Sequence, residues 1–303
     1  MINLEKKVCD ILEKEGPLIG KELFWQAGVD EFTLWSLCRN SPAIASKRVG
    51  NRYLRLDYQV SGYARLSPSI MREFYGYTVV GNSRSTEKII QKAEKLRREI
   101  GEISKNKLSI ARNIIVRMAD ELPHSPILKE NTVFMIAGDV VYGMAHAEPR
   151  PESSTGELVK GSDLDIIAVT SGLSDNNIKE LDDSMYALKY KWLMNPAGRE
   201  ELDYIVKDIV KVEKQLNFDS FRNMIASKIL EESQFLYGSK KIFGRIREML
   251  AEKEILQKIN FLREKAIRER EEAEKYLLSN VDSVTREEWM KLFYTKDEKE
   301  EIF

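Results

Sequence analysis

The chain has 303 residues, of which 43% are hydrophobic and 32% are charged, and its formal net charge is −1. This composition is typical of a globular protein and excludes wholesale disorder and collagen-like repeats, while the length predicts two or three folded units at roughly 150 residues per domain. Its longest apolar runs, such as residues 133–137, are far shorter than the roughly 18 residues of a membrane span. We therefore expect no membrane partner.

Charge is distributed unevenly along the chain. Residues 39–117 carry 17 basic and 6 acidic side chains, whereas both flanking segments are acidic. Such a basic block predicts DNA or RNA as a partner, because phosphate contacts release counterions. The two cysteines, Cys9 and Cys38, are too few for a disulfide framework, and the N-terminus has no signal-peptide pattern, so we expect a cytoplasmic protein.

The first 60 residues predict three helices followed by two strands. The helices are expected over residues 2–15 and 18–26 and after the capping residue Asp30. The strands are expected over residues 43–49 and 52–56, with Gly50-Asn51 as a tight hairpin turn between them. This pattern resembles a winged helix-turn-helix domain.

The resemblance implies that the hairpin is a wing whose basic side chains contact nucleic acid. These side chains are Lys47, Arg48, Arg52 and Arg55. Many winged helices mediate protein contacts instead, so a protein partner is the alternative. The lack of acidic residues between Arg39 and Leu56 favours DNA or RNA.

Residues 85–122 predict one long helix that ends at Pro123. Its apolar residues follow a near-heptad seam, which consists of Ile89, Ala93, Leu96, Ile100, Ile103, Ile110 and Ile114. Lys107 interrupts this seam. A helix of this kind packs on a neighbouring helix or on a second copy of the chain, so a homodimer is one expectation. Its exposed basic face either contacts nucleic acid or is only solvated.

A phosphate-binding pattern begins at residue 133. Residues 133–137 have the composition of a buried strand, and Gly138 precedes a helix expected over residues 140–147. A strand that delivers a glycine to a helix N-terminus presents backbone N–H groups suited to phosphate. The pattern alone is weak and gains weight only from the motifs that follow it.

Two acidic residues flank the start of another expected strand, in the motif Gly161-Ser162-Asp163-Leu164-Asp165. Residues i and i+2 of a strand point to the same face, so Asp163 and Asp165 converge while Leu164 faces the core. Two carboxylates on one face suit a hard divalent cation, and Mg²⁺ binds a few carboxylates together with substrate phosphates.

A third acidic residue, Asp203, lies in the strand-like run 201–206. If this strand neighbours the first one, Asp203 completes the metal site and accepts the proton of an attacking hydroxyl. Asp208, further along the same run, is the less favoured alternative.

These elements, in this order, resemble the core of the nucleotidyltransferase superfamily of the DNA polymerase beta type. The resemblance spans about residues 131–245, including an expected helix over 218–230 and the pair Tyr237-Gly238 that follows it. It implies Mg²⁺ or Mn²⁺ as the cofactor, held by Asp163, Asp165 and Asp203, which are also the catalytic residues. It further implies a nucleoside triphosphate bound by Gly138, Asp139, Gly161 and Ser162.

Two features depart from the family pattern. Asp139 stands where family members usually carry serine or glycine, and a carboxylate there repels a triphosphate unless it is protonated, turned away or itself bound to metal. Residues 140–162 also exceed the usual spacing and include the polar stretch 148–157, which predicts either a substrate-gating loop or a disordered one.

The sequence therefore predicts an α+β protein in four parts. These are a winged helix-turn-helix domain (1–60), a linker and long basic helix (61–122), a nucleotidyltransferase-like domain with a mixed β-sheet and flanking helices (123–245), and a C-terminal helical extension (246–303). The expected reaction moves a nucleoside monophosphate from a nucleoside triphosphate to a hydroxyl acceptor. Nucleic acid is the favoured acceptor, and a protein side chain or a small molecule is the alternative acceptor. The alternative is a nucleic-acid-binding transcriptional regulator, or a toxin–antitoxin component, that keeps the fold with weak or no catalysis.

Overall fold

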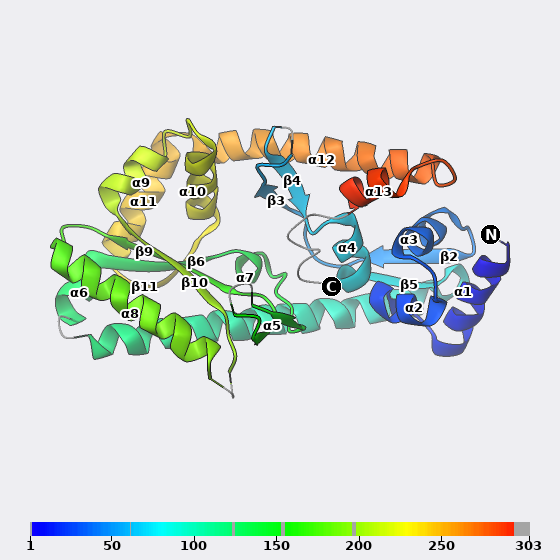
Figure 1. Cartoon of the computed structure of the whole chain (residues 1–303), viewed down its shortest axis with the longest axis horizontal. Helices are drawn as coiled ribbons and strands as arrows, with labels where there is room; N and C mark the ends of the chain where they lie inside the picture. Colours follow the sequence, from blue (N-terminus) through cyan, green and yellow to red (C-terminus); the bar gives the residue numbers. More distant parts are fainter. Residues whose placement is uncertain (1, 61, 123–124, 153–154, 196–197, 294–303) are drawn as a thin grey trace. The chain divides into compact units, whose positions relative to one another are not determined.

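Figure 1 shows the computed structural model, which describes residues 2–60, 62–122, 125–152, 155–195 and 198–293. The chain is a mixed α+β protein, as the sequence predicts. It divides into two compact units: residues 1–99 with 263–303 form unit 1, and residues 100–262 form unit 2. Both boundaries fall inside long helices, namely α5 (Thr86–Glu121) and α12 (Ile255–Ser279).

The first helices of unit 1 agree closely with the prediction. They are α1 (Ile2–Glu15), α2 (Gly20–Ala27) and α3 (Glu31–Asn40). Asp30 caps α3 as expected, because its Oδ1 accepts the backbone N–H of Thr33 at 3.0 Å. The segment Leu18–Ile19, expected to begin the second helix, forms the short strand β1 instead.

The strands of unit 1 do not pair as the predicted hairpin. They are β2 (Ile44–Arg48), β3 (Tyr53–Leu56), β4 (Ala64–Ser67) and β5 (Thr78–Asn82). The hairpin across Gly50-Asn51 is wrong, because β2 pairs with β5 in a sheet ordered β1-β5-β2, while β3 pairs with β4. The long-range pairing places Val79 and Val80, both fully buried, in the central strand, and this burial outweighs the local turn signal.

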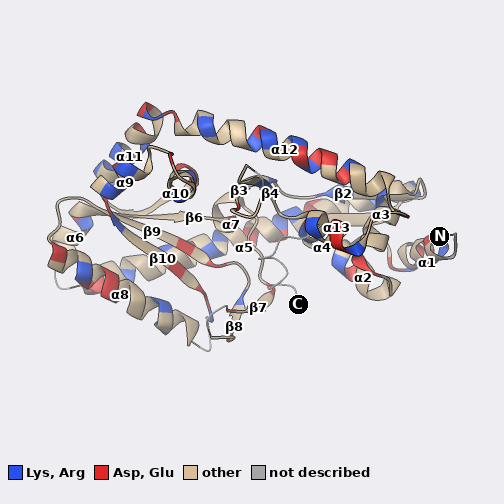
Figure 2. Cartoon of the chain, turned by 45° about the horizontal axis from the view of Figure 1, so that its top comes forward, with Lys and Arg blue, Asp and Glu red and all other residues tan. Residues whose placement is uncertain are grey.

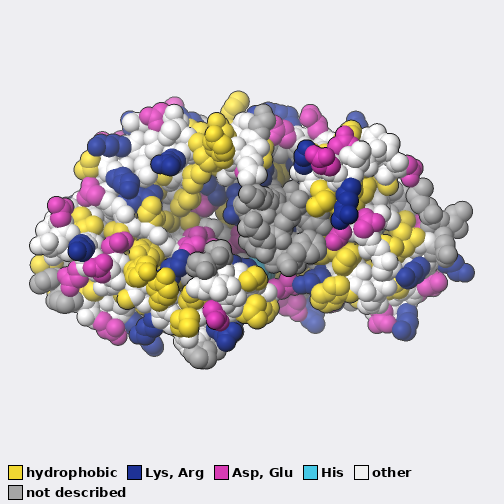
Figure 3. All heavy atoms as spheres, in the orientation of Figure 1, with side chains coloured by type: hydrophobic (Ala, Val, Ile, Leu, Met, Phe, Trp, Pro, Cys, Tyr) yellow, Lys and Arg dark blue, Asp and Glu magenta, His cyan; other side chains and the backbone are white. Residues whose placement is uncertain are grey.

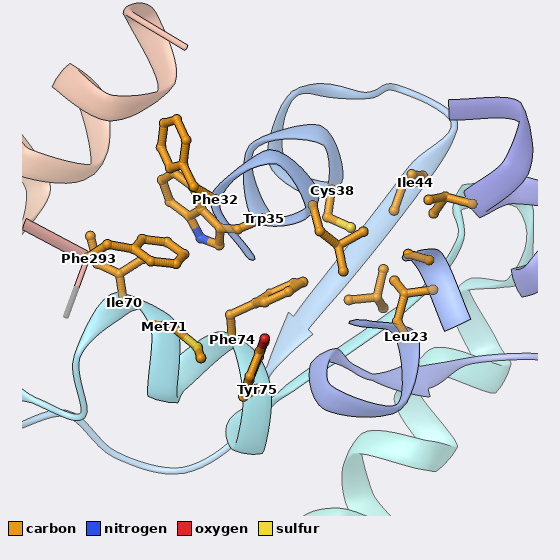
Figure 4. Packing of buried hydrophobic residues seen from close by; sticks show 14 of the residues in the cluster. Leu23, Phe32, Trp35, Cys38, Ile44, Ile70, Met71, Phe74, Tyr75 and Phe293 are labelled. Carbon is orange, nitrogen blue, oxygen red and sulfur yellow. The ribbon is translucent and has the colours of Figure 1, made fainter. Parts of the chain in front are cut away.

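An aromatic core in unit 1 joins α3 to the C-terminal helix α13 (Arg286–Phe293). Phe32 stacks on Trp289 with ring centroids 5.2 Å apart, and Trp35 meets Phe293 edge to face. Figure 4 shows Phe32, Trp35 and Phe293 of this group beside α4 (Ile70–Tyr77). One side of α3 is therefore packed against α13.

Unit 2 is built on a four-stranded sheet in the order β10-β9-β6-β11. Its strands are β6 (Thr132–Ala137), β9 (Leu164–Thr170), β10 (Leu202–Asp208) and β11 (Gln234–Gly238). Strands β9 and β10 run parallel, and β6 is antiparallel to both of its neighbours, so the sheet is mixed. The strands expected over residues 133–137 and 201–206 are thereby confirmed.

Helices cover both faces of this sheet (Figure 1). They are α5, α6 (Ser125–Asn131), α8 (Asp175–Leu193), α9 (Ile209–Gln215), α10 (Phe221–Glu232) and α11 (Lys240–Glu252). On one face, Ile115 of α5 and Leu181 of α8 belong to the same core as Phe134 and Ile166. Helices α9, α10 and α11 lie over the other face, so β6 is buried along its whole length.

The long helix expected over residues 85–122 is confirmed as α5, whereas Pro123 lies outside the described residues. Its seam residues Ile89, Ala93 and Ile114 are each at most 3% exposed within the chain. The homodimer through this helix stays a prediction, and these three residues already have packing partners in one copy.

The inserted stretch before the acidic motif contains a small hairpin. Strands β7 (Pro149–Pro151) and β8 (Leu158–Lys160) pair antiparallel, and residues 153–154 between them lie outside the described part. The helix expected over residues 140–147 is shorter than predicted, since α7 covers only Asp139–Tyr142 and Gly143 follows in a left-handed conformation. The hairpin leads directly into the turn at Gly161.

The face drawn in Figure 3 carries acidic, basic and apolar side chains interspersed with one another. Within the described segments, no helix combines the length and the apolar character that crossing a bilayer demands.

Candidate metal centre

Three aspartates from two parallel strands meet in unit 2. Asp163 precedes β9, Asp165 is the second residue of β9, and the strand register places Asp203 of β10 directly beside Asp165. Each offers a carboxylate oxygen, and these oxygens all lie within 4.8 Å of one another. Figure 2 marks the acidic residues on these neighbouring stretches of β9 and β10. The structure thus brings together the three residues that the sequence selects.

The connection between the strands explains why residues so distant in sequence meet. Helix α8 carries the chain from the end of β9 back to the start of β10, so both strands begin at the same edge of the sheet. Leu164 and Leu202, also paired in register, are fully buried on the opposite face. The alternation of a strand then directs the side chains of Asp165 and Asp203 to one face.

The cluster concentrates negative charge. Burial raises the pKa of Asp165 well above its ordinary value, and Asp163, Asp139, Asp203 and Glu232 raise it further. Burial also raises the pKa of Asp163, although Arg150 opposes this shift. A raised carboxyl pKa means that the ionised form lacks compensation, which a divalent cation would supply.

Two basic side chains lie at the margin of the cluster. Lys189 of α8 donates to Asp203 Oδ1 at 2.6 Å; burial alone lowers the pKa of Lys189, but this hydrogen bond raises it overall. Arg150 of the β7–β8 hairpin places Nη2 2.8 Å from Glu201 Oε2 and 4.0 Å from Asp163 Oδ2. Its Nε donates to the carbonyl of Gly161 at 2.9 Å, which ties the hairpin to the acidic motif.

Gly138 lies so close to the side chain of Asp165 that a residue with a Cβ would collide with it. Its φ is 74°, and a Cβ built there would lie 2.1 Å from Asp165 Oδ2. The backbone N–H of Gly138 donates to Glu232 Oε1 at 3.5 Å, and Lys228 Nζ also lies 2.5 Å from the Glu232 carboxylate. The N–H expected to bind phosphate thus faces a glutamate in this structure, so the phosphate role of Gly138 stays a prediction.

The remaining predicted nucleotide-binding residues form a hydrogen-bonded turn. Ser162, only 3% exposed, accepts from the backbone N–H of His146 at 3.1 Å and donates to Asp139 Oδ2 at 3.4 Å. Gly161 has φ 63°, and a Cβ there would lie 1.8 Å from the His146 carbonyl oxygen. In this structure, Ser162 and Gly161 join the chain after α7 to the acidic motif, and Asp139 lies close enough to raise the pKa of both Asp163 and Asp165.

Several residues around the centre were not selected as site residues from the sequence. They are Arg150, Lys189, Glu201 and Glu232. Glu232 ends α10 and Lys189 lies within α8. Neither residue is separated from the aspartates by a sequence interval that predicts a contact. Arg150 and Glu201 did offer a signal, because Arg150 lies in the insertion just before the acidic motif and Glu201 lies two residues before Asp203, the same spacing as between Asp163 and Asp165.

The basic residues predicted to contact nucleic acid have different environments in unit 1. Arg52 donates to Glu73 at 2.6 and 2.7 Å and to Glu274 at 2.7 Å, and its side chain is 20% exposed. Arg48 is 47% exposed and lies 3.7 Å from Glu73, and Lys47 is exposed on β2, whereas Arg55 on β3 is half-buried. Lys47 and Arg48 are therefore the more accessible members of this set.

Comparisons with known proteins do not assign a family. No family model matches the chain, and no curated protein matches it significantly.

Proposed function

We propose that unit 2 is a metal-dependent nucleotidyltransferase. The convergence of Asp163, Asp165 and Asp203, with carboxylate oxygens within 4.8 Å of one another, is the observation that carries this proposal. The donors are hard oxygens, and the raised pKa of Asp163 and Asp165 marks a deficit of positive charge, so the residues fit Mg²⁺ or Mn²⁺. The mixed sheet that holds them supports the resemblance to the polymerase beta type of nucleotidyltransferase.

In the proposed reaction, an acceptor hydroxyl attacks the α-phosphorus of a nucleoside triphosphate. The bond between the acceptor oxygen and phosphorus forms, the bond from the α-phosphorus to the bridging oxygen breaks, and pyrophosphate leaves. A bound divalent ion supplies neutralisation of phosphate charge and acidification of the hydroxyl. The Asp203 carboxylate accepts the hydroxyl proton, while Lys189 holds that carboxylate in place through its hydrogen bond to Oδ1.

We propose nucleic acid as the acceptor, bound through basic side chains of unit 1. Lys47 and Arg48 are exposed on β2, and the first half of α5 exposes a second basic group. This group consists of Lys88, Lys95, Arg97 and Arg98. A polyanionic partner is attracted to such a surface by phosphate contacts that release counterions.

A second candidate function is a nucleic-acid-binding regulator, or a toxin–antitoxin component, with this fold and weak or no catalysis. The hydrogen bond from Gly138 N–H to Glu232 favours it, since a carboxylate occupies the position expected for a phosphate. Asp139 adds negative charge beside the same segment. Triphosphate binding through Gly138 then requires that Glu232 moves, because Lys228 offsets its charge but does not free the Gly138 N–H.

Label transfer distinguishes the two candidates. The protein is incubated with Mn²⁺ or Mg²⁺ and each labelled nucleoside triphosphate, with RNA, DNA or the protein itself as acceptor. We expect transfer that is lost in Asp163→Ala and Asp165→Ala. Asp208→Asn is the matched control, because Asp208 lies on β10 but caps α9, a role that asparagine fulfils. A folded protein that binds nucleic acid but labels no acceptor would support the regulator.

A further inference from the structure

A buried lysine in α5 connects the two segments that carry the aspartates. Lys107 is 4% exposed, and its Nζ donates to the carbonyl oxygen of Lys160 at 2.5 Å and to Glu200 Oε2 at 2.6 Å. Glu200 is itself only 5% exposed. Taking two charges out of water is costly, so a buried pair of this kind is weak as a source of stability.

The two partners of Lys107 occupy equivalent places relative to the metal centre. Lys160 lies three residues before Asp163, and Glu200 lies three residues before Asp203. The Lys107 ammonium group therefore binds both the segment that precedes β9 and the segment that precedes β10. Lys107 also interrupts the apolar seam of α5. An apolar residue at this position would contribute to packing alone.

Further hydrogen bonds make these segments one connected structure. The N–H of Lys160 donates to Arg199 O and the N–H of Leu164 donates to Glu201 O, both at 2.9 Å. One turn before Lys107, Ser104 Oγ accepts the N–H of Ala145 at 3.1 Å, which anchors the chain after α7 to the same helix. Helix α5 thus bonds to the chain just before β9, just before β10 and after α7.

We propose that Lys107 is a positioning residue for the metal centre. By fixing the segments 160–163 and 200–203 against α5, it sets the separation of the Asp163 and Asp203 carboxylates and so the affinity for the cation. The expected effect on cation affinity rests on the proposed metal-dependent function. The restraint on the two segments is a property of the protein without metal. Groups that orient metal ligands typically change metal affinity by 10–100-fold when they are replaced.

Two measurements on the full chain test the proposal. Mn²⁺ titration followed by electron paramagnetic resonance gives the metal affinity, and amide hydrogen exchange in metal-free protein reports the hydrogen bond from Leu164 N–H to Glu201 O. In Lys107→Met, we expect about tenfold or greater weakening of Mn²⁺ binding and faster exchange at Leu164. Exchange at Leu164 that matches the parent protein would overturn the positioning role, whatever the metal result.

A second variant separates the loss of positioning from the loss of stability that an unpaired buried charge causes. Lys107→Met leaves Glu200 buried without its cation, which destabilises the fold, whereas Lys107→Met/Glu200→Met removes both charges. We expect the double variant to regain folding but to keep the weakened Mn²⁺ affinity, since the Lys160 carbonyl still lacks its donor. Recovery of parent affinity in the double variant contradicts the proposal.

A stability control and the parent protein complete the design. Met249→Ala, in a buried position of α11 on the other face of the sheet, lowers stability without altering the Lys107 contacts, so Mn²⁺ affinity is expected to stay within twofold of the parent. A comparable loss of affinity in Met249→Ala would show that general destabilisation suffices and would refute the positioning role. A parent protein that binds no Mn²⁺ refutes the metal centre, while exchange at Leu164 that is faster in Lys107→Met/Glu200→Met than in Met249→Ala would still establish the restraint.

Discussion

Each unit contains a cluster of charged side chains, and the two clusters are balanced differently. In unit 1, Arg52 and Arg270 each bond to Glu274 at 2.7 Å, and Arg52 also bonds to Glu73. In unit 2, the acidic side chains around Asp165 outnumber the basic ones paired with them. Each carboxylate of the first cluster is paired with more than one arginine, whereas the carboxylates of the second outnumber their basic partners.

The pKa shifts follow this difference. Burial alone would raise the pKa of Glu274, but Arg270 and Arg52 lower it overall. Burial raises the pKa of Asp165, and four neighbouring carboxylates add to the shift instead of opposing it. Paired charges of the first kind support the fold, whereas an acidic cluster with too few basic partners is one that a bound cation would stabilise. This contrast supports the proposed chemistry in unit 2, which rests on the convergence of the three aspartates.

The largest expected effect comes from removing one carboxylate of the unit 2 cluster. Asp165→Asn should lower the rate of nucleotidyl transfer about a thousandfold, since a bound metal contributes several kcal/mol to stabilising the transition state. The same substitution relieves repulsion, so the metal-free variant should unfold at a denaturant concentration no lower than the parent. A combined loss of activity and of stability would instead indicate that Asp165 serves the fold.

Removing an arginine from the unit 1 cluster should lower the stability of the protein, in contrast to replacing Asp165 in the unit 2 cluster. Arg270→Met leaves the half-buried Glu274 beside one fewer cation, and we expect the free energy of unfolding to fall by about 3 kcal/mol. Arg98→Met, at an exposed position of α5, is the control and should change it by less than about 0.5 kcal/mol. Denaturant unfolding measures both variants. An unchanged stability in Arg270→Met would remove the distinction between the clusters.

The sequence predicts the core of the metal centre because its signals are local. The i, i+2 spacing of Asp163 and Asp165 fixes their common face, and a strand-like run around Asp203 suffices once the two strands are neighbours. Glu232 and Lys189 reach the centre through helix packing, which leaves no spacing rule along the chain. Their identification therefore required the structure.

The fold of unit 1 shows where local signals fail. Gly50-Asn51 has the composition of a hairpin turn, yet β2 pairs with β5 and β3 pairs with β4. Likewise, no pattern near Phe32 indicates that its stacking partner is Trp289, at the other end of the chain. Burial of large apolar side chains decides both contacts, and burial depends on the whole unit.

A buried cation in unit 2 provides a third case for the comparison. Burial, together with nearby Lys211, lowers the pKa of Lys207 on β10 from 10.5 to about 8. Between pH 8 and 10.5 the unfolded chain binds more protons at this site than the folded protein, so stability rises with pH there. Lys207→Met should raise the free energy of unfolding at pH 7 by about 2 kcal/mol, at roughly 1.4 kcal/mol per pKa unit with an allowance for residual hydration.

The pH dependence is measured as the difference between the two proteins, which cancels the other titrating groups. The stabilisation by Lys207→Met should be constant below pH 8 and shrink towards zero by pH 10.5. A difference that does not change with pH would mean that Lys207 is fully hydrated in the folded state.

The smallest expected effect concerns the exposed basic residues of unit 1. It tests whether these residues bind nucleic acid, in contrast to Arg52 and Arg270, which are paired with glutamates. In Lys47→Ala/Arg48→Ala, nucleic-acid binding should weaken, and the slope of log affinity against log salt should become shallower by about 2, because each lost phosphate contact removes roughly one released counterion. Lys14→Ala, an exposed lysine of α1, is the matched control and should leave the slope unchanged. Fluorescence anisotropy with labelled RNA and DNA across a salt series gives these slopes. An affinity that is insensitive to salt in the parent protein would contradict phosphate contacts by this surface. The control removes one charge and the test variant removes two, so a slope change of about 1 in the control would mean that any positive charge on unit 1 contributes to the same extent.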